Sequence, residues 1–262
     1  MSQSDPVIEA EYLAQLPLYL LLDARGTSTD RNDLIDGAVI VPVEGWVDAA
    51  RRDATSFDNV DYWGEEFAKL GLSSQTMAVV FDDGLMTEAA RVWFILQFFG
   101  AKALVLNGGT ASLATERASI PVPTPQNTMP FQASYNAGPV GLVDRHTLKD
   151  NLDTTTIFDA RTQAEFKGKD LKSNARGGHL PGAKLLPHSD LLKSGNLRSP
   201  SDSREMLSAI GFQTGDHLVT HCDGGGRAAL AAIAAVRAGY EDVDVYYLSF
   251  SDWAKNESCP VK

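Results

Sequence analysis

The sequence lacks the features of a membrane protein and of a nucleic-acid-binding protein. It has no run of about 18 apolar residues, so we expect no transmembrane helix. Its 23 Lys and Arg residues are outnumbered by 34 Asp and Glu residues, which gives a net charge of −11. Phosphate backbones and anionic lipids repel an acidic chain of this kind. We therefore expect neither nucleic acid nor a membrane as its partner.

Cysteine is also scarce, and no secretion signal is recognisable. Cys222 and Cys259 are the two cysteines among 262 residues, too few for a disulfide framework. The first residues lack the basic start and the apolar core of a signal peptide. A composition with 44% hydrophobic and 22% charged residues is that of a globular chain of one large or two ordinary domains. We therefore expect a reduced, cytoplasmic protein.

Short apolar runs indicate buried parallel strands that alternate with helices. Residues 77–81 and 103–106 are such runs, and each ends in polar residues or glycine. Between them, residues 87–99 fit a helix that is closed by Gly100. Residues 218–221 form another apolar run before an Ala-rich stretch. This alternation predicts an α/β fold.

Motifs of the first half recur in the same order in the second half. Asp23-Ala24-Arg25 returns as Asp159-Ala160-Arg161 after a second apolar run. Asp36-Gly37-Ala38 is echoed by Gly178-His179-Leu180-Pro181-Gly182-Ala183. The ordered recurrence indicates an internal duplication, with two α/β domains that each hold a small parallel sheet.

A stretch rich in proline separates the two copies. We predict a first domain over residues 1–120, a Pro-rich linker over residues 121–138 and a second domain over residues 139–262. When the copies are aligned, Asp82 of the first lies opposite Cys222 of the second. The cysteine loop is therefore a feature of the second copy alone.

The loop at Cys222 is the strongest candidate site. An apolar strand leads into the cysteine, and an Ala-rich helix follows the loop residues Asp223, Gly224, Gly225, Gly226 and Arg227. A cysteine at a helix N-terminus faces unpaired backbone N–H groups and the positive end of the helix dipole. Such a position favours the thiolate, which is the nucleophilic form. Glycines also let consecutive N–H groups point inward around an anion. The alternative is an inert buried cysteine, although such a turn does not need three glycines.

These motifs together resemble the two-domain (tandem) rhodanese family of thiosulfate and 3-mercaptopyruvate sulfurtransferases. The resemblance covers nearly the whole chain and depends on the Asp-Ala-Arg segments, the Gly-His-Leu-Pro-Gly-Ala turn and the strand that ends in Cys222. It implies two tandem rhodanese-like α/β domains, each a small, mainly parallel sheet flanked by helices. It also implies that the first domain is catalytically silent, with Asp82 in place of the cysteine.

The same resemblance implies sulfur transfer through a persulfide on Cys222. The thiolate would take a sulfane sulfur from 3-mercaptopyruvate or thiosulfate, and the loop from Asp223 to Arg227 would hold the persulfide. A thiophilic acceptor would then remove the sulfur: cyanide, a thiol, or a thioredoxin-like protein. No metal or organic cofactor is needed for this reaction.

Three departures from the family pattern bear on the substrate. Asp223 adds a negative charge beside Cys222, which should disfavour the dianion thiosulfate relative to 3-mercaptopyruvate. Glu165 stands where the family has a substrate-binding arginine. Arg161 and Arg227 are then the candidate anion-binding residues; alternatively, Arg161 is a structural ion-pair partner and Arg227 faces solvent. Finally, the Asp-Gly-Ser-Trp turn of the family is replaced by residues 248–253, Leu-Ser-Phe-Ser-Asp-Trp.

Two other functions are compatible with the motif. Cysteine phosphatases also place a cysteine and an arginine on a loop at a helix start, but they use Cys-x5-Arg. Arg227 follows Cys222 one position sooner, and the shorter loop suits one sulfur atom better than a phosphate. The second alternative is a non-catalytic sulfur carrier or binding module, in which Asp223 and Glu165 signal lost turnover.

Overall fold

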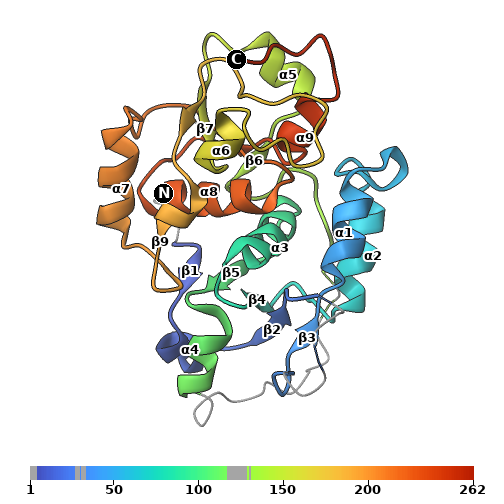
Figure 1. Ribbon diagram of the computed structural model, residues 1–262. Coiled ribbons are helices and arrows are strands. Elements are labelled where there is room, and N and C mark those ends of the chain that lie inside the picture. The colour runs from blue at the N-terminus through green and yellow to red at the C-terminus, as the bar shows by residue number, and fades with distance from the viewer. Residues whose placement is uncertain (1–4, 27–29, 31–33, 117–128, 130) are drawn as a thin grey trace. The chain divides into compact units, whose positions relative to one another are not determined.

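Each half of the chain forms a parallel sheet from the apolar runs (Figure 1). The computed structural model describes residues 5–26, 30, 34–116, 129 and 131–262. It divides into an N-terminal unit, Pro6–Gly138, and a C-terminal unit, Pro139–Lys262, to which Asp5 also belongs. Asp5 lies outside the predicted second domain over residues 139–262, and its carboxylate accepts a hydrogen bond from Arg237 Nε of the C-terminal unit at 2.9 Å.

The N-terminal unit holds a sheet whose five described strands are all parallel and lie in the order β1-β5-β4-β2-β3. The strands are β1 (Val7–Ile8), β2 (Tyr19–Asp23), β3 (Val39–Ile40), β4 (Met77–Phe81) and β5 (Ala103–Leu106). The helices are η1 (Ala10–Gln15), α1 (Val43–Ala50), η3 (Asp53–Thr55), α2 (Val60–Lys69), α3 (Thr87–Phe98) and α4 (Gly109–Glu116).

The C-terminal unit repeats this order as β6-β12-β11-β7-β8, again with parallel pairing between the described strands. Its strands are β6 (Gly141–Leu142), β7 (Thr156–Asp159), β8 (Lys184–Leu185), β11 (Leu218–His221) and β12 (Val243–Val245), with an antiparallel hairpin of β9 (Leu192–Lys193) and β10 (Asn196–Leu197). Its helices are α5 (Arg145–Asp150), α6 (Gln163–Phe166), η4 (His188–Leu191), α7 (Pro200–Ala209), α8 (Gly226–Arg237) and α9 (Ser249–Trp253).

Both faces of the C-terminal sheet are covered, which explains why its strands are apolar throughout. Val219 on β11 and Ile157 on β7 pack into one core cluster with Trp253 of α9. On the other face, Thr220 Oγ1 donates to the Ala228 carbonyl of α8 at 3.0 Å. The small alanines of α8 let that helix lie close to β11 and β12, and α7 packs beside it (Figure 1).

The N-terminal unit buries aromatic side chains beneath its helices. Phe57 contacts Phe98 edge-on with ring centroids 5.3 Å apart, and Trp63 stacks on Phe99 at 5.7 Å. Half of the predicted linker over residues 121–138 lies outside the described residues. Its described end belongs to this unit, since Ser134 N–H donates to the Phe99 carbonyl at 3.1 Å. Among the described residues, none of the helices is both long and apolar enough to cross a membrane.

Candidate functional site

Cys222 lies between the end of β11 and the start of α8, and its side chain is almost fully buried. The Gly225 N–H donates to Cys222 Sγ at 3.1 Å. This contact places the sulfur at the N-terminus of a helix of 12 residues, in the positive field of its dipole. The sulfur therefore faces a backbone N–H donor at a helix N-terminus, the kind of position at which proteins bind anions.

Gly225 is required at its position by both backbone conformation and space. Its φ is +101°, a region that glycine adopts without steric cost. A Cβ on this residue would lie 2.9 Å from the Tyr247 carbonyl oxygen and 3.0 Å from the Tyr247 ring. The glycine thus allows the turn that directs its N–H toward Cys222.

Ser249 is part of the site and was not singled out in the sequence. Its hydroxyl accepts a hydrogen bond from the Cys222 N–H at 3.0 Å and lies 3.8 Å from Cys222 Sγ. The same hydroxyl is 2.8 Å from the Tyr246 carbonyl oxygen, to which it donates. Ser249 is fully buried with a φ of +58°, a strained conformation for a residue with a Cβ. The sequence pointed to Ser249 only in that residues 248–253 depart from the Asp-Gly-Ser-Trp turn of the family.

Arg227 and Glu165 form a bidentate ion pair beside the loop. Arg227 donates from its two terminal nitrogens to the two Glu165 carboxylate oxygens at 2.7 and 2.8 Å. Arg227 therefore does not face solvent unpaired, and its charge is balanced by a carboxylate. The prediction that Arg227 supplies the missing positive charge for a substrate anion needs this correction: the cation is present, but Glu165 neutralises it.

Glu165 is held in place by the first turn of α6. Thr162 and Glu165 form a capping box, in which Thr162 N–H and Oγ1 donate to Glu165 Oε2 at 3.0 and 2.8 Å. Burial alone would raise the pKa of Glu165, but hydrogen bonds from Arg227 and Thr162 outweigh burial and lower it to about 2. The same pair raises the pKa of Arg227 despite the effect of burial. Both groups are ionised at neutral pH.

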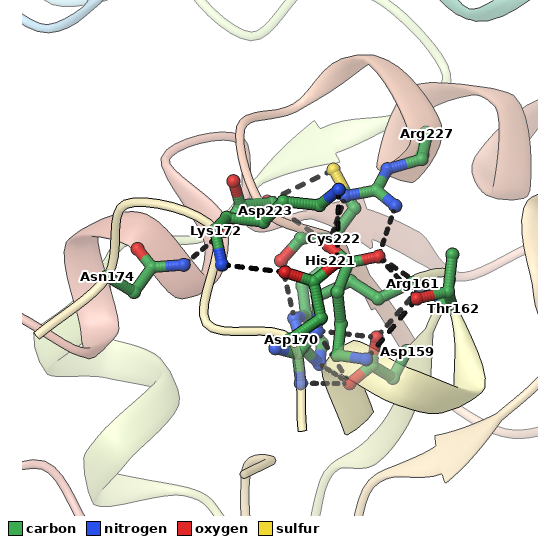
Figure 2. Close-up of polar contacts among 12 residues, drawn as sticks. Asp159, Arg161, Thr162, Asp170, Lys172, Asn174, His221, Cys222, Asp223 and Arg227 are labelled. Carbon is green, nitrogen blue, oxygen red and sulfur yellow. Dashed lines mark hydrogen bonds and ion pairs between the residues drawn. The ribbon is translucent and has the colours of Figure 1, made fainter. Parts of the chain in front are cut away.

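Asp223 lies at the edge of the site, next to a loop that follows α6. Its Oδ1 accepts a hydrogen bond from Asn174 Nδ2 at 2.6 Å. On the same loop, Lys172 Nζ pairs with Asp170 Oδ2 at 3.2 Å. In Figure 2, Asn174 lies to the left of Cys222 and Arg227 lies to its right. Sequence reasoning missed Asn174, because it is 49 positions from Asp223 and no motif contains it.

Arg161 lies beneath the loop and is 2% exposed. Its guanidinium pairs with Asp159 at 2.7 Å, donates to the Gly178 carbonyl at 2.8 Å and stacks over the Phe250 ring at 4.0 Å. These contacts pair the positive charge of Arg161 with groups inside the protein. They favour the structural ion-pair role over the role in substrate binding.

His221 and Cys259 both lie in the core. His221 is fully buried, with Nε2 3.4 Å from Asp159 Oδ2. Burial lowers the pKa of His221 although Asp159 opposes the shift, so the imidazole is neutral and adds no positive charge beside Cys222. Cys259 is 1% exposed and packs with Trp253 in the core cluster. No group of three or more potential metal ligands occurs among the described residues.

The equivalent loop of the N-terminal unit is filled by its own carboxylate. Asp82 is buried, and its two carboxylate oxygens accept hydrogen bonds from four backbone N–H groups at 2.9–3.2 Å. Burial raises the pKa of Asp82, although these donors oppose the shift. The donors belong to Gly84, Met86, Glu88 and Ala89.

Comparisons with known proteins point to one family. Residues 144–256 match the family model described as the rhodanese-like domain. The chain is 25% identical to 3-mercaptopyruvate sulfurtransferase of Escherichia coli (strain K12) over 276 residues, which cover 97% of each protein. It is 30% identical to a probable 3-mercaptopyruvate sulfurtransferase of Pseudomonas aeruginosa over 200 residues, which cover 73% of this chain and 69% of that protein.

Solved structures share the fold. The anaerobic ergothioneine biosynthesis enzyme from Chlorobium limicola matches with a TM-score of 0.79 and 20% sequence identity. The match covers 98% of this chain and 70% of that chain. At this identity the likeness concerns the fold alone, which agrees with the two α/β units predicted from the sequence.

Proposed function

This chain belongs to the rhodanese family, and we propose that it is a sulfurtransferase with Cys222 as its nucleophile. One observation carries the assignment of the residue: the Gly225 N–H donates to Cys222 Sγ at the N-terminus of α8. An N–H donor and a helix dipole both stabilise a thiolate, and they stabilise a persulfide anion in the same way. The names of the relatives support the reaction class.

The reaction has two half-reactions. In the first, the Cys222 thiolate attacks the thiol sulfur of 3-mercaptopyruvate or the outer sulfur of thiosulfate, so that an S–S bond to Sγ forms. The bond between the transferred sulfur and the rest of the donor breaks, and its electron pair leaves with sulfite or with the enolate of pyruvate, which takes up a proton to become pyruvate. In the second, an acceptor takes the outer sulfur, and Cys222 leaves as a thiolate. Cyanide or a thiol, for example that of a thioredoxin-like protein, would serve as acceptor, and we propose a cytoplasmic location.

The remaining loop residues have distinct roles in this proposal. Gly224, Gly225 and Gly226 shape the turn that directs backbone N–H groups to the sulfur. Arg227 and Glu165 form a fixed ion pair on one side of Cys222, in which the two charges balance each other. Asp223 adds a negative charge on the other side and disfavours a dianionic donor.

Thiocyanate formation from cyanide tests the proposal against a carrier that does not turn over. We expect the protein to produce thiocyanate with 3-mercaptopyruvate and, more slowly, with thiosulfate. Cys222→Ser should lose this activity completely. Cys259→Ala changes the second cysteine of the chain, which lies in the core cluster, and should keep the thiocyanate-forming activity. Activity that survives in Cys222→Ser would overturn the assignment, and release of phosphate from phosphate esters without thiocyanate would favour the phosphatase alternative.

A further inference from the structure

Asp223 directly follows the proposed nucleophile in the chain, and hydrogen bonds hold both its backbone and its side chain. Its main-chain carbonyl accepts a hydrogen bond from the Ser251 N–H at 3.1 Å, so the backbone is anchored to α9. The Asn174 amide binds Oδ1 at 2.6 Å and sets the orientation of the side chain. Asp223 is partly exposed, as a group that meets a ligand must be. The carboxylate is therefore a positioned feature of the site.

Asp223 forms no ion pair with any Lys, Arg or His side chain of the described chain. Two cations of the site form ion pairs with other carboxylates: Arg227 with Glu165 and Lys172 with Asp170. Asn174 is neutral and contacts one of the two carboxylate oxygens. A carboxylate accepts hydrogen bonds at both oxygens, and its strongest partner is a charged donor such as an ammonium group. The second oxygen thus offers a place for a cation of a ligand.

We propose that Asp223 makes the site selective for sulfur acceptors that are aminothiols, small thiols with a protonated amine close to the sulfur. The inference rests on the proposed function, because it concerns the removal of sulfur from a Cys222 persulfide. The acceptor ammonium pairs with the Asp223 carboxylate while its sulfur faces Cys222. Anionic thiols of the same size are repelled by the same carboxylate.

The transfer step balances without a further reagent. The acceptor sulfur attacks the outer sulfur of the Cys222 persulfide, and a new S–S bond forms to the acceptor. The bond between Cys222 Sγ and the outer sulfur breaks, and its electron pair stays on Sγ. The proton of the acceptor thiol ends on Cys222. The products are the acceptor persulfide and the free enzyme thiol, with no net oxidation.

Thiols of similar size and different charge test the selectivity. The enzyme is first loaded with sulfur from 3-mercaptopyruvate and freed of donor. Cysteamine, 2-mercaptoethanol and mercaptoacetate then serve as cationic, neutral and anionic acceptors, and loss of the extra sulfur is followed by intact mass. We expect the rate ratio of cysteamine to 2-mercaptoethanol to be about fivefold higher in the native enzyme than in Asp223→Asn. The comparison between variants cancels the intrinsic reactivity of the thiols.

Two further variants test whether the rate ratio depends on the positioned Asp223 carboxylate or on the net charge of the protein. Asn174→Ala releases the carboxylate and should lower the ratio part of the way. Asp242→Asn removes the same charge at the opposite end of the strands and should leave the ratio unchanged. Equal ratios in the native enzyme and Asp223→Asn would overturn the inference. Absence of sulfur loading in the first step would instead overturn the proposed function itself.

Discussion

Glu165 is a buried carboxylate whose charge is balanced by its neighbours. It is 2% exposed, and Arg227 and Thr162 both donate to it. Its pKa in the folded protein, about 2, is well below its ordinary value near 4.3 in an unfolded chain. The folded state therefore prefers the ionised form, and the pair joins α6 to the start of α8.

Substitution of Glu165 should reduce the stability of the protein most at neutral pH. A depressed carboxyl pKa contributes stability that is fully present above the unfolded value, near pH 4.3, and is lost as the pH falls toward 2. We expect Glu165→Gln to lower the free energy of unfolding by about 3 kcal/mol at pH 7, because Arg227 loses its anionic partner. The difference from the native protein should shrink below about pH 4. Urea unfolding at a series of pH values measures both effects.

An exposed ion pair provides the matched control for this change. Asp48 and Arg52 pair at 3.7 Å with both side chains more than half exposed. Asp48→Asn should change the free energy of unfolding by no more than about 0.5 kcal/mol at any pH. If Glu165→Gln behaved like this control, the ion pair with Arg227 would not stabilise the fold.

At the scale of strands and helices, the apolar runs located the central strands. The predicted runs over residues 77–81, 103–106 and 218–221 coincide with β4, β5 and β11, since a strand buried on both faces must be apolar along its length. The two-residue edge strands β1 and β6 could not be predicted in this way. They are defined by pairing with β5 and β12, and two residues carry no periodic pattern.

In the candidate site, too, the sequence predicted the residues of a local motif but not those that come from distant parts of the chain. Local motif chemistry located the loop from Cys222 to Arg227, because glycines, a cysteine and a following helix are adjacent in the chain. Ser249 and Asn174 reach this loop from 27 and 49 positions away. Their roles depend on how the second sheet brings α9 and the loop after α6 together, which no local pattern records.

Substitution of Gly225 tests the loop as an element. A Cβ at this position would meet Tyr247, and the positive φ would strain the backbone. We expect Gly225→Ala to destabilise the protein by about 3 kcal/mol and to slow sulfur loading about 100-fold, the order of magnitude for losing one positioned N–H donor. Gly71→Ala is the control, because its φ is also positive but its Cβ would meet no atom within 4 Å. It should cost about 1 kcal/mol and leave loading unchanged.

At the scale of the whole chain, the two units repeat one strand order with different residues in the loop. In the C-terminal unit a backbone N–H faces the sulfur of Cys222. In the N-terminal unit four N–H groups are satisfied by the carboxylate of Asp82, which leaves no vacant donor at that carboxylate for a sulfur anion. The two loops thus differ in the group that faces their backbone N–H donors, and the silence of the first domain stays a prediction.

The number and position of sulfur atoms taken up by the chain test this account most directly. We would measure intact mass after incubation with 3-mercaptopyruvate or with thiosulfate, followed by peptide mapping, for the native protein, Cys222→Ser and Asp82→Asn. We predict a gain of one sulfur on the Cys222 peptide in the native protein and in Asp82→Asn, removable by cyanide, and no gain in Cys222→Ser. Sulfur on Cys259, or a gain that persists in Cys222→Ser, would contradict it.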